Sequence, residues 1–202
     1  MPLAGRPILG HALRGALRCP RLAHVVVVVP PGWQEAARAV VAEGGQAAYV
    51  TVVAGGAERH DSVAAGLAAL DPAAQVVLVH DAARCLTPAA VFDRVSAEVR
   101  AGAPAVVPGV PVVDTIKQVD ERGLVTATPE RALLRAVQTP QGFRRDVLER
   151  AHASATGATG ATDDAGLVER IGQPVRVVPG DPRAAKVTTS DDLAAAARIL
   201  GR

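Results

Sequence analysis

Short runs of β-branched apolar residues alternate along this chain with Ala-rich stretches of helical spacing, and this alternation limits the possible folds more than any other feature. The apolar runs are continuous, which is typical of strands whose two faces are both covered by helices. Four of them are predicted strands: 24–30, 48–54, 75–80 and 103–108. Apolar and small residues at three- and four-residue spacing predict helices between them, over 33–42, 61–70 and 88–101. We therefore expect an α/β domain with a mostly parallel sheet.

A different pattern occupies residues 110–139, where apolar and polar residues alternate around a turn at Asp120–Gly123. It predicts an antiparallel hairpin or arm that can project from the body and pair with a partner subunit. The remaining predicted elements are a helix over 141–151, a flexible loop over 153–161, a helix over 163–171, a strand over 175–178 and a helix over 190–200. Ser190 is the predicted N-cap of the last helix. No domain boundary is visible, so 1–202 is expected to be one domain.

Composition excludes several classes of function. The chain has 202 residues, of which 49% are hydrophobic, and its formal net charge of +2 leaves no basic stripe for nucleic acid. Its longest apolar run is too short to span a membrane, and no signal peptide is recognisable. Cys19 and Cys85 lack metal-ligand spacing and suit a reducing compartment. We expect a soluble cytoplasmic protein without nucleic-acid or membrane partners.

Two polar segments follow predicted strands, where ligands bind in α/β sheets. In the segment 55–62, two glycines allow close approach to a ligand and a helix N-terminus offers free N–H groups; the alternative is a plain turn with a helix cap. In the segment His80–Arg84, Asp81 can accept hydroxyl groups or stand near a metal, and Arg84 can meet a phosphate. The alternative there is an internal Asp81–Arg84 salt bridge. His80 is expected to be structural.

Further candidates precede the last two predicted helices. Lys186, one of only two lysines besides Lys117, stands before two threonines and suits an anionic group. Asp163 and Asp164 also precede a helix, where paired carboxylates are more often caps than metal ligands. The sequence contains no catalytic triad, zinc cluster, Walker loop or dinucleotide fingerprint. The residues alone thus predict an α/β domain with a polar crevice suited to phosphates.

Six segments in order resemble one family, the 2-C-methyl-D-erythritol 4-phosphate cytidylyltransferases of non-mevalonate isoprenoid biosynthesis. They are GGAERHDSVAAGL, VLVHDAARCLTP, PVVDTIKQVD, RAVQTPQGF, TDDAGLVE and KVTTSDDL. The resemblance implies a three-layer nucleotidyltransferase fold of glycosyltransferase-A type and a homodimer formed through the arm 110–139. It also implies transfer of CMP from CTP to methylerythritol phosphate with release of pyrophosphate. Mg²⁺ is implied as bound by the phosphates, with no metal ligand assigned to the protein.

The resemblance also implies roles for particular residues. The nucleotide-binding residues would be Gly55, Gly56, Ser62, Asp81 and Ala82. The substrate-binding residues would be Asp81, Arg84, Thr115, Arg131, Thr162 and Lys186. Thr115 and Arg131 would reach from the arm to the partner's substrate phosphate, and Arg131 and Lys186 would orient the attacking phosphate. Without the resemblance, Arg131 would be taken for a surface charge of the arm.

Three departures from the family pattern concern Ala57, Cys85 and the start of the chain. Ala57 stands where the family often has an acidic or polar residue, and Cys85 stands where the family usually has proline. The third is larger, because the family's first strand and its loop A-A-G-x-G-x-R, with a later Pro-Lys, do not precede Met1–Gly5. We therefore expect a missing first strand, impaired activity of the chain as written, and a true start upstream. The alternatives are a cytidylyltransferase for another alditol phosphate, such as ribitol 5-phosphate, and a catalytically dead paralogue that binds nucleotide or partner.

Overall fold

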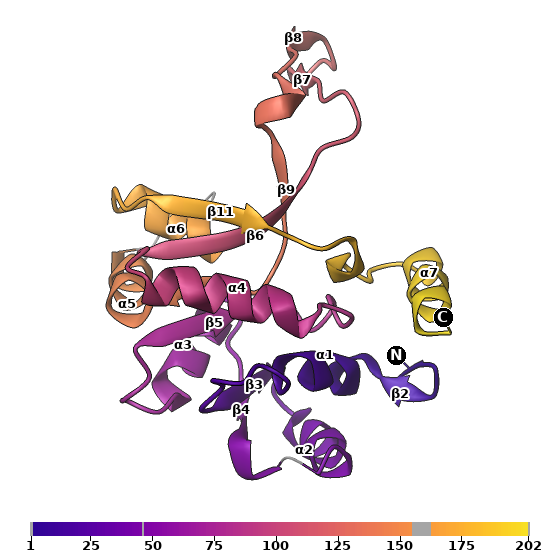
Figure 1. Cartoon of the computed structure of the whole chain (residues 1–202), viewed down its shortest axis with the longest axis vertical. Helices are drawn as coiled ribbons and strands as arrows, with labels where there is room; N and C mark the ends of the chain where they lie inside the picture. The colour runs from indigo at the N-terminus through magenta and orange to yellow at the C-terminus, as the bar shows by residue number, and fades with distance from the viewer. Residues whose placement is uncertain (1, 46, 155–162, 202) are drawn as a thin grey trace.

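The computed structural model describes residues 2–45, 47–154 and 163–201 (Figure 1). Its helices are α1 (Ile8–Ala16), α2 (Gln34–Glu43), α3 (Arg59–Ala69), α4 (Ala89–Arg100), α5 (Arg145–Ser154), α6 (Asp164–Arg170) and α7 (Ser190–Leu200). Its strands are β1 (Pro2–Leu3), β2 (Arg6–Pro7), β3 (Val25–Val29), β4 (Val50–Ala54), β5 (Val76–Val79), β6 (Ala105–Pro111), β7 (Gln118–Val119), β8 (Val125–Ala127), β9 (Arg135–Val137), β10 (Gln141–Arg144) and β11 (Val175–Pro179). Helices and strands alternate as the sequence predicts, although α1, β1, β2 and β9 are not among the predicted elements.

The main sheet is mixed, which corrects the expectation of a mostly parallel one. Its strand order is β11-β6-β10-β5, with β9 also paired to β6. Only β6 and β11 run parallel, while β10 lies antiparallel between β5 and β6. The predicted helix over 141–151 is therefore wrong in its first four residues, which form β10. A Cβ at Gly142 would lie 2.5 Å from Val95 of α4, so the close packing of α4 on this strand requires glycine.

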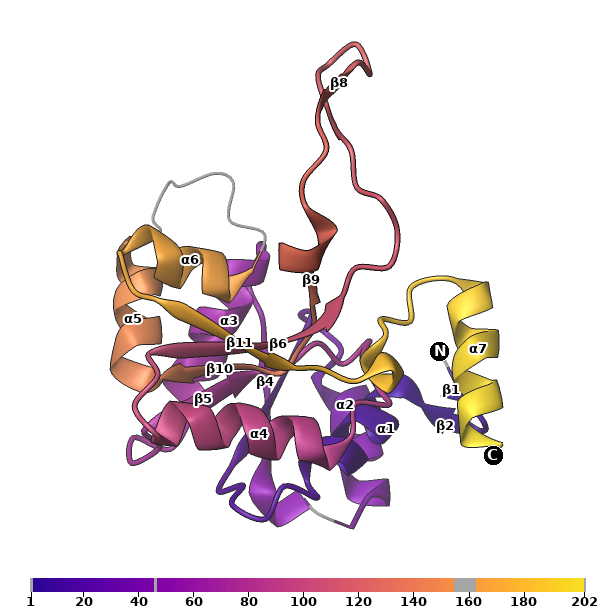
Figure 2. The same cartoon turned by 45° about the horizontal axis from the view of Figure 1, so that its top comes forward.

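Helices cover both faces of this sheet. Successive side chains of β6 point alternately to the two faces and therefore belong to two different cores. Val106 points into a core with Val91, Val95 and Val99 of α4. Ala105 and Val107 point to the other face, toward a core built from α3, α5 and α6. In Figure 2, α4 lies on one side of the strands and α3, α5 and α6 lie on the other. Because strand residues alternate in direction, one buried strand serves both cores and three layers result.

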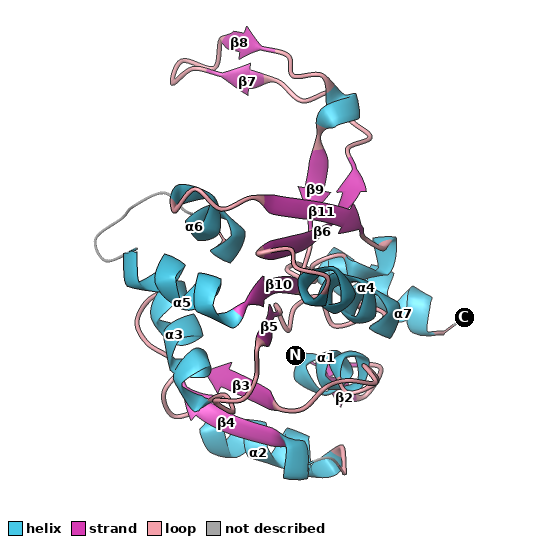
Figure 3. Ribbon diagram, turned by 60° about the vertical axis from the view of Figure 1, so that its left-hand side comes forward, coloured by secondary structure: helices cyan, strands magenta, loops and turns pink. Residues whose placement is uncertain are grey.

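Strands β3 and β4 form a separate parallel pair. In the described part of the chain no ladder of hydrogen bonds joins β3 to β5, although β3 and β4 lie beyond β5 in Figure 3. Helix α3 connects the two sheets: its Leu67 belongs to the core beneath β5, and a Cβ at Gly66 would touch Val28 of β3.

The segment between β6 and β9 projects far from the body and carries the β7–β8 hairpin (Figure 2). The predicted turn is confirmed, since the N–H of Asp120 donates to the carbonyl of Leu124 and Gly123 adopts φ +79°. A positive φ favours glycine, because other residues meet steric conflict there. The hairpin makes β7 and β8 antiparallel partners.

The last helix, α7, has the predicted bounds, but its N-cap lies one residue earlier than the sequence predicts. Thr189, not Ser190, is the N-cap: its side chain accepts a hydrogen bond from the N–H of Asp192, whose carboxylate accepts the N–H of Thr189. A reciprocal capping box satisfies two N–H groups, which Ser190 cannot do from inside the helix. The predicted loop 153–161 falls partly in α5 and otherwise outside the described residues. None of the described helices has the length and apolar character required to cross a bilayer.

Candidate functional site

The loop Gly55–Gly56 lies against the first turn of α3 so closely that side chains do not fit. A Cβ at Gly55 would lie 2.5 Å from the Ser62 hydroxyl oxygen, and one at Gly56 would lie 2.2 Å from the Cβ of Asp61. The helix starts at Arg59, two residues before the predicted start, and Glu58 and Asp61 form its capping box. Both glycines and Ser62 are thus brought together, as predicted, at the carboxyl end of β4.

Asp81 and Lys186, which are far apart in the sequence, form an ion pair. The Lys186 ammonium lies 3.1 Å from Oδ2 of Asp81, with 48% of the lysine and 27% of the aspartate side chain exposed. The backbone holds the two segments together, because the N–H of Val187 donates to the carbonyl of Ala83. A half-exposed cation beside a carboxylate at the end of β5 can meet a phosphate and a hydroxyl group of one ligand.

Arg84 is bonded neither as a free phosphate-binding group nor as the salt-bridge partner of Asp81, the two roles that the sequence suggests. Its guanidinium donates to the carbonyls of Ala184 and Val137, at 2.8 and 3.3 Å, and no salt bridge with Asp81 forms among the described residues. Its Nε is buried, and burial lowers the pKa of this guanidinium although Asp81 acts in the opposite direction. In this arrangement Arg84 joins the segment that carries Lys186 to β9. It therefore positions Lys186 rather than facing a ligand itself.

His80 is linked to the backbone of Asp81 through the side chain of Thr139. The hydroxyl oxygen of Thr139 lies 2.9 Å from Nδ1 of His80 and accepts the N–H of Asp81 at 3.0 Å. The imidazole also packs edge-on against Phe92, with ring centroids 4.9 Å apart. Burial lowers the pKa of His80 to about 4, so the ring is neutral at pH 7. This geometry agrees with the structural role predicted for His80.

Thr115 and Arg131 both lie on the arm and are exposed. Arg131 donates to the carbonyl of Val113, 2.8 Å away, so its side chain contacts the loop that leads to Thr115. Within the described residues of one chain, no contact joins either residue to the Asp81–Lys186 pair. Ala82 is exposed beside that pair, and Thr162 lies outside the described residues.

The paired aspartates before α6 serve two separate purposes. Asp163 caps the helix by accepting the N–H of Gly166 at 2.9 Å, as the cap interpretation predicts. Asp164 is fully buried and pairs with Arg59 and His152. Among residues 2–45, 47–154 and 163–201, no group of three or more His, Cys, Asp or Glu side chains is placed to hold a metal ion.

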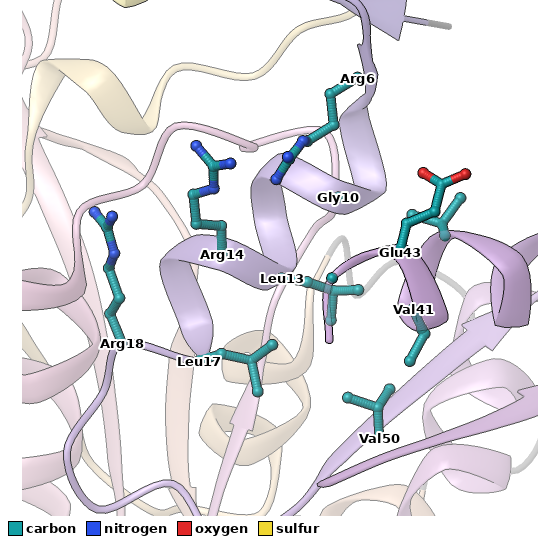
Figure 4. Close-up of a pocket in the computed structure, with 11 residues that line it drawn as sticks. Arg6, Gly10, Leu13, Arg14, Leu17, Arg18, Val41, Glu43 and Val50 are labelled. Carbon is teal, nitrogen blue, oxygen red and sulfur yellow. The ribbon is translucent and has the colours of Figure 1, made fainter. Parts of the chain in front are cut away.

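A separate groove of about 340 Å³ lies between α1 and α2 (Figure 4). Leu13, Leu17, Val41 and Val50 form its apolar floor, and Arg14 projects at its rim. None of the predicted site residues lines this groove. The Gly55–Gly56 loop and the Asp81–Lys186 pair thus lie outside this groove.

Four side chains of this region make contacts that the sequence-based assignment does not predict: Arg59, Thr139, Gln141 and Asp164. Gln141 donates to Asp163 at 2.6 Å and accepts the N–H of Ala165, and it lies opposite Val79 in the sheet. All four stand inside the matched segments, between residues that received a role. Polar side chains in a segment that otherwise packs in the core are the signal that points to Thr139, Gln141 and Asp164, whereas Arg59 stands in an exposed stretch without such a signal.

Comparison with known proteins identifies the family of the chain. The family model described as 2-C-methyl-D-erythritol 4-phosphate cytidylyltransferase matches residues 1–202. The enzyme of that name from Nocardia farcinica is 52% identical over 202 residues, which cover 100% of this chain and 85% of that protein. The one from Saccharopolyspora erythraea is 53% identical over 203 residues, covering 99% of this chain and 89% of that protein.

Solved structures share the fold. The crystal structure of 4-diphosphocytidyl-2C-methyl-D-erythritol synthase from Anaerococcus prevotii superposes with a TM-score of 0.91 at 26% identity, covering 100% of this chain and 88% of that one. That of the Thermus thermophilus 2-C-methyl-D-erythritol 4-phosphate cytidylyltransferase superposes with a TM-score of 0.78 at 35% identity, covering 100% and 92%. The chain belongs to the 2-C-methyl-D-erythritol 4-phosphate cytidylyltransferase family.

Proposed function

We propose that this protein transfers CMP from CTP to 2-C-methyl-D-erythritol 4-phosphate, giving the CDP-alditol and pyrophosphate in non-mevalonate isoprenoid biosynthesis. The observation that carries the proposal is the Asp81–Lys186 pair, 3.1 Å apart, in a chain that matches the family from end to end. The three-layer arrangement supports the glycosyltransferase-A type of nucleotidyltransferase fold. Cys19 and Cys85 are free and buried, which suits the cytoplasmic location proposed with it.

The reaction needs position and charge neutralisation rather than a covalent intermediate. A phosphate oxygen of the acceptor attacks the α-phosphorus of CTP, a new P–O bond forms, and the bonding pair to the β-phosphate oxygen leaves with pyrophosphate. Two anions must approach each other in line, so a cation at the attacking phosphate lowers the barrier. We assign this role to Lys186, which Asp81 holds in the crevice.

The nucleotide and the acceptor occupy neighbouring parts of the crevice in this proposal. Close packing of Gly55 and Gly56 on the first turn of α3 fixes the loop that would face the cytosine, and the Ser62 hydroxyl, which donates to the Glu58 carbonyl at 3.2 Å, can also accept a hydrogen bond from the base. The Asp81 carboxylate and Ala82 face the ribose and polyol hydroxyls. Arg84 acts by holding the Lys186 segment, and Thr162 completes the acceptor pocket.

We also propose a homodimer whose arms exchange. Apolar side chains on the arm are exposed without a partner in the described chain: Val113 by 82%, Leu133 by 78%, and Leu124 and Val125 by 58% each. Exposed apolar surface on a projecting hairpin suits contact with a second copy. Such contact would carry Thr115 and Arg131 to the partner's crevice, where Arg131 would join Lys186 at the attacking phosphate.

The magnesium ion implied by the family does not find a protein-built site among the described residues. Mg²⁺ is usually bound by one or two carboxylates together with substrate phosphates. Asp81 already pairs with Lys186, and no cluster of three potential ligands is present in the described part. The phosphate-bound Mg²⁺ stays a prediction, and the steps above use only side chains of this chain.

Pyrophosphate release tests the function. We expect release from CTP with methylerythritol phosphate, little with ribitol 5-phosphate, and a loss of about 100-fold in Lys186→Ala, since removing one donor to the transition state costs that much. Lys186→Arg keeps the charge and is expected to recover part of the rate. A preference for ribitol 5-phosphate would overturn the acceptor. CTP binding without turnover, measured by calorimetry, would favour the catalytically dead paralogue.

A further inference from the structure

Asp164 is a carboxylate with no exposed surface that the proposed reaction does not use. Its Oδ2 lies 2.6 Å from Nη2 of Arg59, and its Oδ1 lies 3.0 Å from Nε2 of His152. Burial raises the pKa of Asp164, but the hydrogen bonds from His152 and Arg59 outweigh it and the net pKa is lowered. The carboxylate is therefore charged. A buried charge is costly unless it is paired, so this contact needs an explanation.

The contact joins the two sheets that otherwise lack a common ladder. Arg59 opens α3 and follows the loop Gly55–Gly56, which continues from β4. Asp164 opens α6, which is fixed to β10 because Gln141 bonds both Asp163 and the N–H of Ala165. Gln141 in turn lies opposite Val79, two residues before Asp81. The Arg59–Asp164 pair thus links the nucleotide loop on one sheet to the strand that carries Asp81 on the other.

Arg59 also lies within the electrostatic reach of the site. Burial lowers the pKa of its guanidinium, but the hydrogen bond to Asp164 and the charges of Asp164, Asp81 and Asp163 raise it overall. Its side chain is 44% exposed, although one nitrogen is fixed on a buried partner. A cation in this place, between the two predicted halves of the site, is suited to fix their separation.

The opposite end of α3 is held by a different arginine. Arg145 donates to the carbonyls of Asp71 and Leu67, at 2.7 and 3.4 Å, and its own carboxylate partner is Glu149. The Leu67 side chain packs in the core between α3 and the five-stranded sheet. The C-terminal end of α3 is thus anchored by apolar packing and Arg145, and its N-terminal end by Arg59.

We infer that the Arg59–Asp164 pair is a positioning clamp that sets the Gly55–Gly56–Ser62 loop at a fixed distance from the Asp81–Lys186 pair. The inference rests on the proposed function for its consequence in catalysis. Arg59 is a positioning residue here, and it acts through the loop rather than on the reacting atoms. Since a misplacement of about 1 Å can cost roughly 100-fold in rate, loosening the clamp is expected to lower kcat more than it raises KM.

The test combines a readout that needs no turnover with one that does. Hydrogen exchange of the peptide covering residues 55–66 is expected to be faster in Arg59→Gln and in Asp164→Asn than in the unmodified protein. Arg145→Gln is the matched control: it removes an arginine from the far end of the same helix, and we expect faster exchange there but not at 55–66. Unchanged exchange at 55–66 in Arg59→Gln and Asp164→Asn would overturn the clamp, whether or not the protein turns over.

Kinetics then separate positioning from direct contact with substrate. We expect kcat to fall about 10- to 100-fold in Arg59→Gln, with KM for CTP changed less than about 3-fold, and partial recovery in Arg59→Lys. The double variant Arg59→Gln/Asp164→Asn should be no slower than the slower single variant, because both act through one contact. A double variant slower by the product of the single effects would overturn the inference. Hydrogen exchange decides on the clamp independently of turnover, so the clamp and the proposed function can fail separately.

Discussion

Neutral His80 shows how burial selects the protonation state of a single side chain. Its ring is enclosed beside Phe92, and Nδ1 lies within hydrogen-bond distance of the Thr139 hydroxyl. Its Nε2 is buried and has no hydrogen-bond partner among the described residues. A protonated ring would need a second acceptor at Nε2, so the pocket disfavours the charge and the pKa falls to about 4.

A prediction about the pH dependence of stability follows for His80. In the unfolded chain its pKa is near 6.5, so the unfolded state binds a proton that the folded state rejects as the pH falls from 7 toward 4. The free energy of unfolding should therefore fall by about 2 kcal/mol between pH 7 and pH 5 from this group alone. His80→Asn keeps a polar atom near Thr139 but cannot titrate.

The measurement is urea unfolding of both proteins at the two pH values. We expect His80→Asn to be less stable at pH 7, because the packing on Phe92 is lost, and the gap to close by about 2 kcal/mol at pH 5. The other histidines are common to both proteins and cancel in the difference. Equal pH dependence of the two proteins would show that His80 does not carry this linkage.

At the scale of elements, the sequence predicts those helices and strands that depend on local spacing, and it fails for those that depend on contacts between distant segments. Helices α2, α3 and α4 and strands β3 and β5 are predicted within a few residues, because their local spacing already encodes which side is buried. The strand β10 is missed because the residues after it, Arg145–Ser154, do form a helix, and only pairing with β5 and β6 makes Gln141–Arg144 extended. That pairing is non-local and leaves no period in the sequence.

The two glycines inside α1 provide a prediction at the same scale, since identical substitutions should have opposite effects. Gly10→Ala places a Cβ 3.1 Å from Cγ of Arg6, a flexible side chain that can move aside. We expect it to stabilise the protein by about 0.5–1 kcal/mol, because alanine loses less backbone entropy in a helix. Gly15→Ala places a Cβ 2.8 Å from the Thr87 carbonyl oxygen, which is backbone, and should destabilise by about 1–3 kcal/mol.

Thermal and urea unfolding of the two variants beside the unmodified protein check this. The pair controls for helix propensity, which is the same in both, so only the surroundings differ. Stabilisation by both substitutions would mean that α1 can move away from the loop containing Thr87. Destabilisation by both would mean that the Arg6 side chain is held in place at the groove rim shown in Figure 4.

At the scale of the whole molecule, the candidate site is only partly predictable from sequence. Asp81 and Lys186 were assigned from their positions after a strand and before a helix, and the fold brings them to 3.1 Å. Arg59 with Asp164, and His80 with Thr139, are side-chain pairs that no motif spacing encodes, since each depends on how separate elements pack. Arg131 depends on a second chain, so a single sequence and a single chain leave its partner open.

Mixing two inactive variants tests the exchange of arms between subunits. If Arg131 acts in the partner's crevice, a mixed dimer of Arg131→Ala and Lys186→Ala has one intact site, which combines Lys186 of one subunit with Arg131 of the other. Half of the dimers are mixed after subunit exchange, so we expect about a quarter of the unmodified activity from two variants that are each nearly inactive. If Arg131 served its own subunit, no mixed dimer would contain an intact site.

The control removes the arm contact without touching either site residue. Val113→Glu/Leu133→Glu places charges on two side chains that are 82% and 78% exposed in the single chain, so its stability as a monomer should change by less than about 0.5 kcal/mol each. Light scattering should show a monomer, and introducing these changes into both partners of the mixture should abolish the recovered activity. Full activity of the Val113→Glu/Leu133→Glu monomer with Arg131 and Lys186 both intact would place Arg131 in the crevice of its own chain, and the arm would then fold back rather than cross to a second copy.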